Sequence, residues 1–222
     1  MNVEGPTRFG EEGLSLEFGV RILEMTFLLE IAYTSVVFVA LYLLADFVSG
    51  LFHWAEDTLG ADDTPIWGPL FAAPNSRHHS DPSAMLKIHW LRNNSLLVGA
   101  CVGLAMVFWV FGALTWHVVV FAFFTGTAQQ VHRFSHAPSA RLPRFVRLLQ
   151  RMHVLQDARH HWGHHRAPHL TRYCVVTPWL NPVLDRIKFW RVMDRLFVPI
   201  FGAPRRSDLC EKPWYRAQGF WA

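Results

Sequence analysis

Long apolar runs constrain the fold of this chain more than any other feature of its sequence. Three of them are expected to be spans, at residues 31–52, 94–112 and 114–131, and the first reads IAYTSVVFVALYLLADFVSGLF. A helix of about 20 apolar residues is long enough to cross the hydrocarbon core of a bilayer. The chain is 51% hydrophobic and 17% charged, whereas soluble domains average about 25% charged residues. We therefore predict an all-α integral membrane protein.

The number of spans depends on the segment that precedes the first run. Residues 14–30 are more amphipathic and are expected to form either an interfacial helix or an extra span, which gives three or four transmembrane helices in total. A short turn separates the second and third runs, so these two should form an antiparallel hairpin. No internal repeat or linker divides residues 1–222, and we predict a single domain.

The distribution of basic residues predicts the orientation in the membrane. The turn near Ala113 has no Lys or Arg, whereas the 53–93 loop contains Arg77, Lys87 and Arg92, and residues 132–222 are rich in arginine. Positive charge favours the cytoplasmic side of a membrane. The loop and the tail are therefore expected to face the cytoplasm, at the bacterial inner membrane or the endoplasmic reticulum. This assignment also explains the net charge of +4 without a nucleic-acid partner.

The N-terminal residues and the cysteines do not indicate a targeting peptide or a cysteine-based site. Residues 1–13 are polar and acidic, so we expect no cleaved signal peptide. Cys101, Cys174 and Cys210 are too widely spaced for a zinc knuckle and predict no disulfide framework.

Two segments of the tail have apolar residues at helical spacing with arginines between them. They occupy residues 142–156 and 183–197, and we predict amphipathic helices that lie on the membrane. Between them, residues 172–182 are interrupted by Pro178 and Pro182, which predicts a loop or a re-entrant segment.

The 13 histidines of the chain are concentrated at one predicted boundary of the membrane. His53 ends the first span, and the pair His78 and His79 lies in the loop that follows it. His132 and His136 end the third span, and the run ARHHWGHHRAPH at 158–169 adds five more. Segments that are distant in sequence thus bring imidazoles to the same side of the bilayer.

The local spacing of these histidines also predicts metal binding. HRFSH places His132 and His136 four residues apart, hence on one helix face, and RHHWGHH contains two such pairs, His160 with His164 and His161 with His165. In HWAED, Asp57 follows His53 by four residues. Many imidazoles with a carboxylate suit a transition metal such as iron. Zinc needs about four ligands, so this larger set favours two irons.

Several further polar residues have more than one interpretation. Asp46, inside the first span, is expected to hydrogen-bond a ligand histidine, or otherwise to make a packing contact with Ser49. His153 and His169 are candidate outer ligands or neighbours of the ligands. We expect interfacial or packing roles for His89 and His117. Phe121, Phe123 and Phe124 could line a slot for a lipid chain or face the lipid.

Four of these motifs resemble a known family. DFVSGLFHWAEDTLG, RHHSDPSAM, HRFSHAPSARLPRFVRLLQ and ARHHWGHHRAPHLTRYCVVTPWLN are similar, in the same order, to the histidine motifs of the plasmanylethanolamine desaturase family, also called Kua or CarF-like lipid desaturases. The resemblance runs from about Asp46 to Phe197. The wider group includes plant plastid enzymes that desaturate acyl chains of phosphatidylglycerol, so the motifs specify the fold better than the substrate.

The resemblance implies an integral membrane, non-haem diiron desaturase. Its substrate would be an ether phospholipid with an O-alkyl chain, which it would convert into the vinyl ether of a plasmalogen. It would use O2 as co-substrate and take electrons from cytochrome b5 or a ferredoxin. The ligand set that the resemblance implies is His53, Asp57, His78, His79, His132, His136, His160, His161, His164 and His165. Within it, the residues taken as catalytic are His53, Asp57, His132, His136, His161 and His165.

Three other functions remain open from the sequence. An acyl-chain desaturase and a lipid or carotenoid hydroxylase would use similar irons. A metal transporter or sensor is the non-enzyme alternative, and it would spread its ligands across the bilayer or along an exposed tract. The clustering of histidines at one boundary favours an enzyme.

Overall fold

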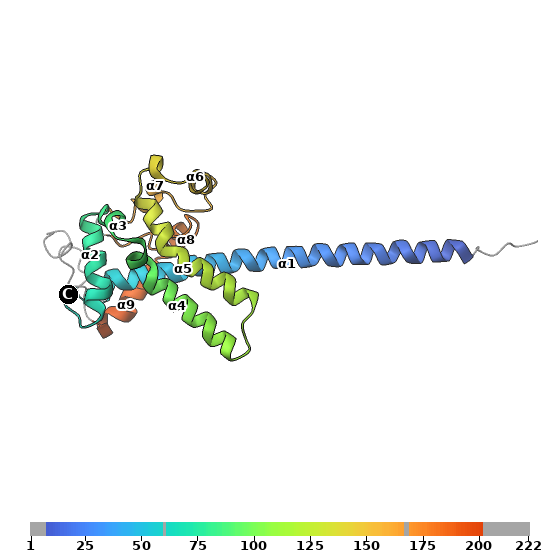
Figure 1. Ribbon diagram of the computed structural model, residues 1–222, viewed down its shortest axis with the longest axis horizontal. Coiled ribbons are helices and arrows are strands. Elements are labelled where there is room, and N and C mark those ends of the chain that lie inside the picture. Colours follow the sequence, from blue (N-terminus) through green and yellow to red (C-terminus); the bar gives the residue numbers. More distant parts are fainter. Residues whose placement is uncertain (1–7, 60, 167–168, 202–222) are drawn as a thin grey trace, which may run out of the picture. The chain divides into compact units, whose positions relative to one another are not determined.

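The computed structural model describes residues 8–59, 61–166 and 169–201, with side chains from residue 18 onward. Residues 1–7 of the predicted N-terminal segment, Cys210 and the end of the predicted tail lie outside the described residues. Within the described ranges the regular structure is helical and no strand occurs, which confirms the all-α prediction. The helices are α1 (Arg8–Thr58), η1 (Gly68–Ala72), α2 (Ala73–Ser80), α3 (Ala84–Lys87), α4 (Trp90–Val110), α5 (Trp116–His136), η2 (Ser139–Arg141), α6 (Arg144–Arg151), α7 (Ala158–His161), α8 (Leu180–Arg186) and α9 (Phe189–Phe201) (Figure 1).

The chain divides into two units, residues 1–41 and residues 42–222. The described part of the first unit is helical throughout and belongs to α1. A boundary was expected near residue 30, between an interfacial helix and the first span, but α1 passes through this position without a break. The physical reason is that no glycine or proline interrupts residues 20–49, so nothing in the sequence stops the helix.

Two helices of the described chain are long and apolar enough to cross a membrane. They are Phe18–Thr58 within α1 and Trp90–Val110, which is α4. Large apolar side chains on these helices, such as Leu29, Val102 and Trp109, are exposed, as lipid-facing side chains are. The third predicted span, 114–131, overlaps α5 from Trp116 onward, but α5 is not among the helices that are long and apolar enough to cross a membrane. A count of three or four spans therefore stays a prediction.

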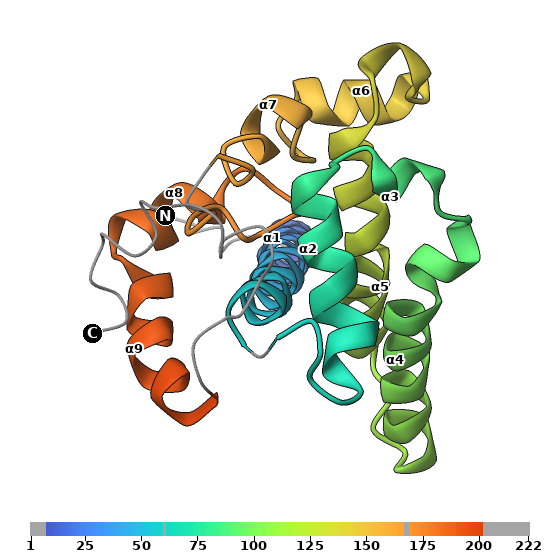
Figure 2. The ribbon, with the colours of Figure 1, turned by 90° about the vertical axis from the view of Figure 1, so that its left-hand side faces the viewer.

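α4 and α5 pack side by side as the short turn between them predicts (Figure 2). Gly112 closes α4 with a φ of 67°, a left-handed conformation that glycine adopts without steric cost. α5 ends at His136, and Pro138 follows two residues later, where it cannot continue the helix. The hairpin therefore delivers the C-terminal end of α5, with its two histidines, to the interior of the second unit.

Residues 42–58 of α1 lie at the centre of the second unit. One apolar cluster joins them to α8, α9 and the preceding loop, through Trp54, Tyr173, Cys174, Leu184 and Trp190. A second cluster joins Tyr42 to α5 and to the loops, through Ala128, Val175 and Val176. These two clusters fix the end of α1 between the tail and the hairpin, where it contributes His53 and Asp57.

The tail differs in part from its prediction. The segment 142–156 forms only the two-turn helix α6, and 183–197 is divided between α8 and α9. The division falls at Lys188, whose φ of 57° interrupts the helix. Residues 169–179 have no regular structure, which agrees with most of the predicted 172–182 loop, but α8 begins at Leu180 and includes Pro182, because proline is tolerated in the first turn of a helix. Cys101 and Cys174 are buried, free thiols.

Candidate metal centre

Four segments of the second unit bring nine potential metal ligands together. α1 contributes His53 and Asp57, α2 contributes two histidines and α5 two more, and α7 with the turn after it contributes three. The ligand atoms form two groups, each with all its atoms within 4.8 Å of one another. The five-histidine group is His78, His132, His136, His161 and His165, and the mixed group is His53, Asp57, His79 and His164.

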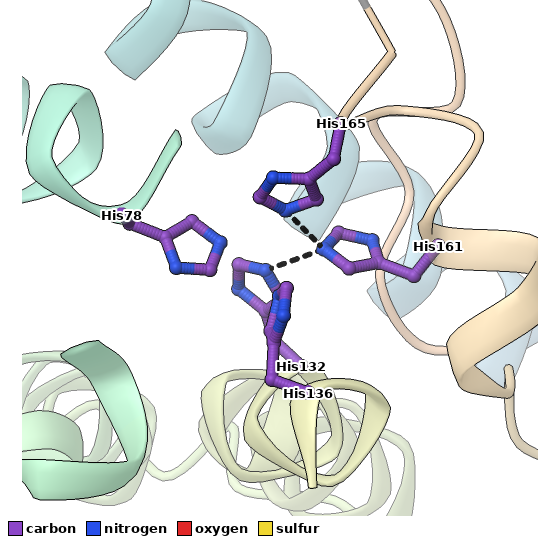
Figure 3. A group of neighbouring side chains, drawn as sticks. All are labelled: His78, His132, His136, His161 and His165. Carbon is purple, nitrogen blue, oxygen red and sulfur yellow. Dashed lines mark hydrogen bonds between the residues drawn. The ribbon is translucent and has the colours of Figure 1, made fainter. Parts of the chain in front are cut away.

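The five-histidine group converges on one point from three directions (Figure 3). The Nε2 atoms of His132 and His161 lie 2.9 Å apart, and those of His165 and His161 lie 3.2 Å apart. His132 and His136 come from successive turns of α5, as their spacing in the sequence predicts. Their rings are tilted or nearly perpendicular to each other and to that of His161, and one nitrogen of each lies within 4.8 Å of the other ligand atoms of the group.

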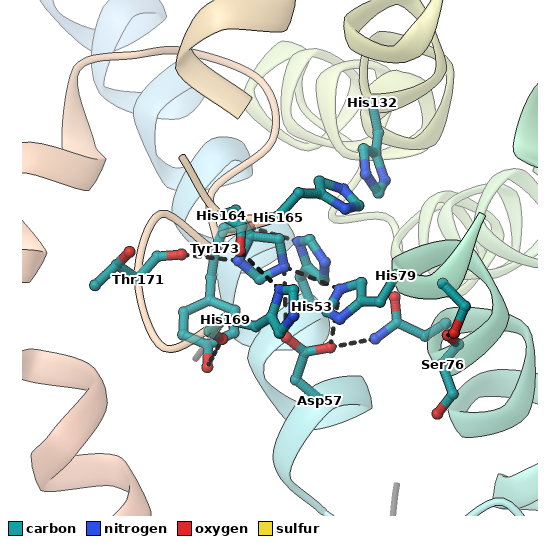
Figure 4. Close-up of polar contacts among 12 residues, drawn as sticks. His53, Asp57, Ser76, His79, His132, His164, His165, His169, Thr171 and Tyr173 are labelled. Atoms are coloured by element: carbon teal, nitrogen blue, oxygen red, sulfur yellow. Dashed lines mark hydrogen bonds and ion pairs between the residues drawn. The ribbon is translucent and has the colours of Figure 1, made fainter. Parts of the chain in front are cut away.

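The mixed group is centred on Asp57 (Figure 4). The Nε2 atoms of His79 and His164 lie 3.1 Å apart, and they lie 3.5 Å and 3.4 Å from the two carboxylate oxygens of Asp57. The two groups adjoin each other, because the rings of His53 and His132 have centroids 5.1 Å apart. Each group could hold one metal ion, so the two ions would share one pocket.

The separations between nitrogens fit metal coordination. A bond from a transition metal to an imidazole nitrogen is about 2.1 Å long, so adjacent corners of an octahedron lie roughly 3.0 Å apart. The Nε2 pairs of His132 and His161, and of His79 and His164, are at 2.9 Å and 3.1 Å. The five donors of the five-histidine group exceed the four of a structural tetrahedral zinc site, and neither group contains a cysteine. The donor set fits iron or a similar transition metal.

Backbone carbonyls fix the orientation of two ligands of the mixed group. His53 Nδ1 donates to the carbonyl oxygen of Tyr173 at 3.1 Å, and His164 Nδ1 donates to that of Thr171 at 2.8 Å. A histidine that donates through Nδ1 is held in the tautomer whose Nε2 carries the lone pair. The loop before α8 thus orients these two rings for metal binding.

Burial keeps the imidazoles neutral. The pKa values of His78, His161 and His164 lie well below the ordinary value, chiefly because burial disfavours the charged form and secondly because other histidines are close. A neutral imidazole has the lone pair that a metal requires.

His78 gives a separate indication of a ligand. Both of its ring nitrogens are buried, and within the described residues neither has a hydrogen-bond partner. A buried polar atom without a partner costs about 1–3 kcal/mol. A metal ion bound by the five-histidine group would satisfy one of these nitrogens.

Comparisons with known proteins agree with this geometry. Residues 42–208 match the family model described as lipid desaturase domain. The chain belongs to the lipid desaturase domain family. This result confirms the resemblance seen in the motifs, and the matched residues include all nine ligands of the two groups.

Several named desaturases are similar to this lipid desaturase domain over about three quarters of the chain. The sequence is 36% identical over 178 residues to mouse plasmanylethanolamine desaturase 1, which covers 75% of this chain and 65% of that protein. It is 31% identical over 178 residues to the plasmanylethanolamine desaturase of Myxococcus xanthus, covering 76% and 62%. It is 33% identical over 169 residues to chloroplastic fatty acid desaturase 4 of Arabidopsis thaliana, covering 75% and 52%. The chain spans less than two thirds of the length of these relatives, and no solved structure matches it.

One residue of the implied ligand set lies outside both groups of this lipid desaturase domain. His160 Nε2 accepts a hydrogen bond of 3.0 Å from Asn181 Nδ2, and its carbonyl oxygen accepts one from Arg172. His161, the next residue, points into the five-histidine group instead. The sequence could not choose between them, because both pairs in RHHWGHH have the same spacing.

The two histidines that were candidate neighbours of the ligands, His153 and His169, lie in different environments. His169 is buried, stacks on His79 with ring centroids 4.6 Å apart, and donates through Nδ1 to the carbonyl of His164. His153 is exposed and lies outside both groups. The structure thus places His169, and not His153, against the ligands.

Asp46 contacts Ser49 and a loop, and not the ligand histidine that was the preferred expectation. Its carboxylate accepts hydrogen bonds from Val176 N–H at 2.8 Å and from the Thr177 hydroxyl at 2.6 Å. Among its described contacts there is no hydrogen bond to a ligand histidine, whereas the alternative contact with Ser49 is present, since the Ser49 hydroxyl donates to the Asp46 carbonyl at 2.6 Å. Asp46 acts on the site through the loop, which carries the Tyr173 carbonyl that orients His53.

Sequence reasoning missed Asn75. It is buried in α2, and its side-chain Nδ2 donates to Asp57 Oδ1, which holds the carboxylate in the mixed group. Asn75 precedes His79 by four residues, so both project from one face of α2. This i, i+4 spacing was a signal that could have identified it.

Proposed function

We propose that this protein is an O2-dependent membrane desaturase with two iron ions, which introduces the vinyl-ether double bond into 1-O-alkyl ether phospholipids. The main support for this proposal is the pair of adjoining ligand groups, which lie at the C-terminal ends of α1 and α5. The names and similarity of the mouse and Myxococcus relatives support the ether-lipid substrate.

The residues of the centre have defined tasks in such a reaction. When bound, two irons would supply the redox chemistry that activates O2 and removes hydrogen from an unactivated C–H bond. The five-histidine group would hold one ion and the mixed group the other. Asp57 contributes the negative charge that offsets part of the charge of the cations, and Asn75 orients it.

The overall reaction balances with an external reductant. The alkyl chain loses two hydrogen atoms from the two carbons next to the ether oxygen. O2 is reduced to two waters: the two hydrogen atoms of the substrate supply two electrons and two protons, a carrier such as cytochrome b5 or a ferredoxin supplies two more electrons, and the solvent supplies two protons. Burial of the ligands excludes bulk water from the centre, which protects the oxidising equivalents from side reactions. We place the ligand side of the helices at the cytoplasmic face, because the 53–93 loop and the tail are basic and positive charge favours that side of a membrane.

An acyl-chain desaturase is the second candidate, since the Arabidopsis relative is named a fatty acid desaturase. The same irons could serve both reactions, and the position of the new double bond separates them. Loss of two hydrogens at the ether-linked chain gives an acid-labile product, whereas an acyl-chain product is acid-stable. Gain of one oxygen atom would instead identify a hydroxylase.

The test is expression of the chain in a plasmalogen-free host supplied with alkyl ether lipid. We expect acid-labile vinyl ethers by mass spectrometry, and a loss of at least about tenfold in the Asp57→Asn variant, because amide oxygen is a weaker ligand. Asp81→Asn is the matched control, since Asp81 pairs with Lys87 at the surface. Absence of vinyl ether with the wild type, or equal product from Asp57→Asn, would contradict the proposal.

A further inference from the structure

Trp162 is exposed at the surface and lies against a potential ligand of the candidate metal centre. Its side chain is 54% exposed. Its ring is nearly parallel to that of His165, with an angle of 19° between the planes and 5.9 Å between the ring centroids. Three histidines of the five-histidine group are buried, whereas His165 and His136 are partly exposed. Trp162 therefore connects the surface to the centre through one ligand side chain.

Two arginines flank this tryptophan. The Trp162 N–H donates to the Ala158 carbonyl at 2.9 Å, so Arg159 and Trp162, three residues apart, are neighbours on one helical face. Arg166 directly follows His165. Both arginines are exposed, and among the described residues no hydrogen bond or ion pair engages either guanidinium. Arg159, Trp162 and Arg166 together form the tryptophan patch.

The surroundings of the tryptophan patch are also basic. Residues 133–184 contain eight arginines, one aspartate and no lysine or glutamate. Arg159 lines a cavity together with Arg147 and Arg151 of α6. The aspartate, Asp157, also lines this cavity, but its Oδ1 accepts a backbone N–H of α7 at 2.7 Å and caps that helix. The excess of positive charge attracts acidic partners and speeds their association.

The position and composition of the tryptophan patch favour a protein partner over the bilayer. α7 lies at the end of the second unit opposite to the turn between α4 and α5 (Figure 1, Figure 2). Trp162 is the only exposed large apolar side chain of residues 153–166, whereas a helix that binds a membrane surface exposes a row of them. Tryptophan and arginine are also enriched among the residues that dominate the binding energy of protein–protein interfaces.

The proposed function requires a route for electrons from outside the protein. The reaction takes two electrons from a carrier, and most of the ligands are buried, so a carrier protein cannot touch them directly. An electron crosses a protein most readily where packed atoms make its path short. The stacked rings of Trp162 and His165 provide such a path from the surface.

We propose that the tryptophan patch is the docking site of a small acidic electron-carrier protein, and that electrons pass through Trp162 to His165 and the metal centre. The proposal rests on the proposed function, because it names where the reductant of that reaction binds. Each encounter oxidises one reduced carrier by one electron. Two encounters supply the two electrons that the reduction of O2 requires in addition to those from the substrate. Trp162 undergoes no net change, and the two arginines orient the carrier by charge.

Binding is measured first, because it does not depend on turnover. The probes are the soluble haem domain of cytochrome b5 and a plant-type ferredoxin, each titrated into the purified full chain in nanodiscs. The patch variant, Arg159→Gln/Arg166→Gln, should bind the better of the two probes about fivefold more weakly than the wild type does. Salt at about 0.5 M should remove most of this difference, since it screens exposed charges. The control variant, Arg92→Gln/Arg195→Gln, removes two exposed arginines of α4 and α9 and should bind like the wild type.

Electron transfer is measured next, by mixing the reduced carrier with the iron-loaded full chain in the absence of O2. Trp162→Leu should lose most of the limiting rate at saturating carrier, whereas Trp162→Phe should keep most of it, because an aromatic ring remains beside His165. Trp179→Leu is the matched control, since Trp179 is 44% exposed and has no ring contact with a ligand among the described residues. Dithionite with methyl viologen needs no docking site, so product formation with this small reductant should equal that of the wild type in every variant.

The outcomes decide between the possible roles of the tryptophan patch. Equal carrier affinity in the patch variant and the wild type, or an unchanged limiting rate in Trp162→Leu, would overturn the proposal. A low rate of Trp162→Leu with the small reductant as well would reduce Trp162 to a structural support of His165. Quenching by brominated phospholipid of the fluorescence that Trp162→Phe loses would place this residue in the bilayer and assign the patch to the membrane surface.

The same measurements separate this proposal from the proposed function. If binding and oxidation of the carrier depend on the tryptophan patch but no vinyl ether forms, the docking site stands and the proposed function fails. If vinyl ether forms and the patch variant binds the carrier as the wild type does, the proposed function stands and the docking site fails.

Discussion

At the scale of single residues, adjacent histidines in this protein have different environments. His160 and His161 are consecutive in α7, yet His161 enters the five-histidine group and His160 faces Asn181. A helix turns by about 100° per residue, so neighbouring side chains point in different directions. The first pair of the doubled motif therefore supplies one potential ligand and one structural contact, whereas the second pair, His164 and His165, supplies one potential ligand to each group.

Replacement of these two residues should give different losses. His161→Ala removes a donor from the five-histidine group, so we expect iron content to fall and product formation to drop by at least about tenfold. His160→Ala removes one hydrogen bond to Asn181, which should lower stability by about 1 kcal/mol while iron content stays close to that of the wild type. Iron analysis of both purified variants measures this. Loss of iron from His160→Ala would make His160 a ligand and the arrangement described above incorrect.

At the scale of elements, buried polar contacts join α1 to the loop before α8. Asp46, Ser49 and His53 lie on one face of α1 and bond Val176, Val175 and Tyr173 respectively, so the loop runs along the helix. The 169–179 loop has no secondary structure of its own to bind its backbone groups. The carboxylate and hydroxyl of α1 replace those missing partners.

The Asp46 contacts should show graded and coupled effects. Asp46→Ala leaves two buried donors without an acceptor, so we expect a loss of about 2–5 kcal/mol, whereas Thr177→Val should lose about 1 kcal/mol. In the double variant the losses should not add, because the Thr177 hydroxyl acts through Asp46. Thermal unfolding in detergent of the two single variants and the double variant measures this. Simple additivity would mean that Asp46 and Thr177 stabilise the protein independently.

At the scale of the whole molecule, the candidate metal centre joins elements that are far apart in sequence. Its ligands come from α1, α2, α5 and the region of α7, and each group takes donors from at least three of these segments. Metal binding therefore favours the folded arrangement over any state in which the segments separate. Without metal, several buried imidazoles must remain in a cluster with few partners.

Removal of metal should consequently destabilise the protein. At free iron 100-fold above its dissociation constant, bound metal adds about 2.7 kcal/mol of stability, which corresponds to a shift of roughly 5–10 °C in Tm for a chain of this size. Protein treated with a chelator should therefore melt at a lower temperature, and ferrous iron should restore the original value. The control is the Asp57→Asn variant, in which ferrous iron should raise the melting temperature by less than in the wild type. Identical melting curves with and without chelator would argue against a metal centre that links these elements.

Sequence alone determined the features that are local in the chain. The apolar runs predicted the helices, and the i, i+4 spacings of His53 with Asp57 and of His132 with His136 predicted shared faces, because both depend on helical periodicity within one segment. Composition and ligand type then pointed to a transition metal at one end of the helices. The motifs were specific enough to identify the family before any geometry was known.

Tertiary structure alone decided how these segments meet. It divided the donors into two groups and excluded His160 from both. It gave Asp46 a loop as its partner in place of a histidine. It also placed Arg147 and Arg159 around one cavity. Each of these facts depends on contacts between residues many positions apart, and on backbone exceptions such as Lys188 and His169. Periodicity carries no information about such contacts, because they are set by how whole elements pack.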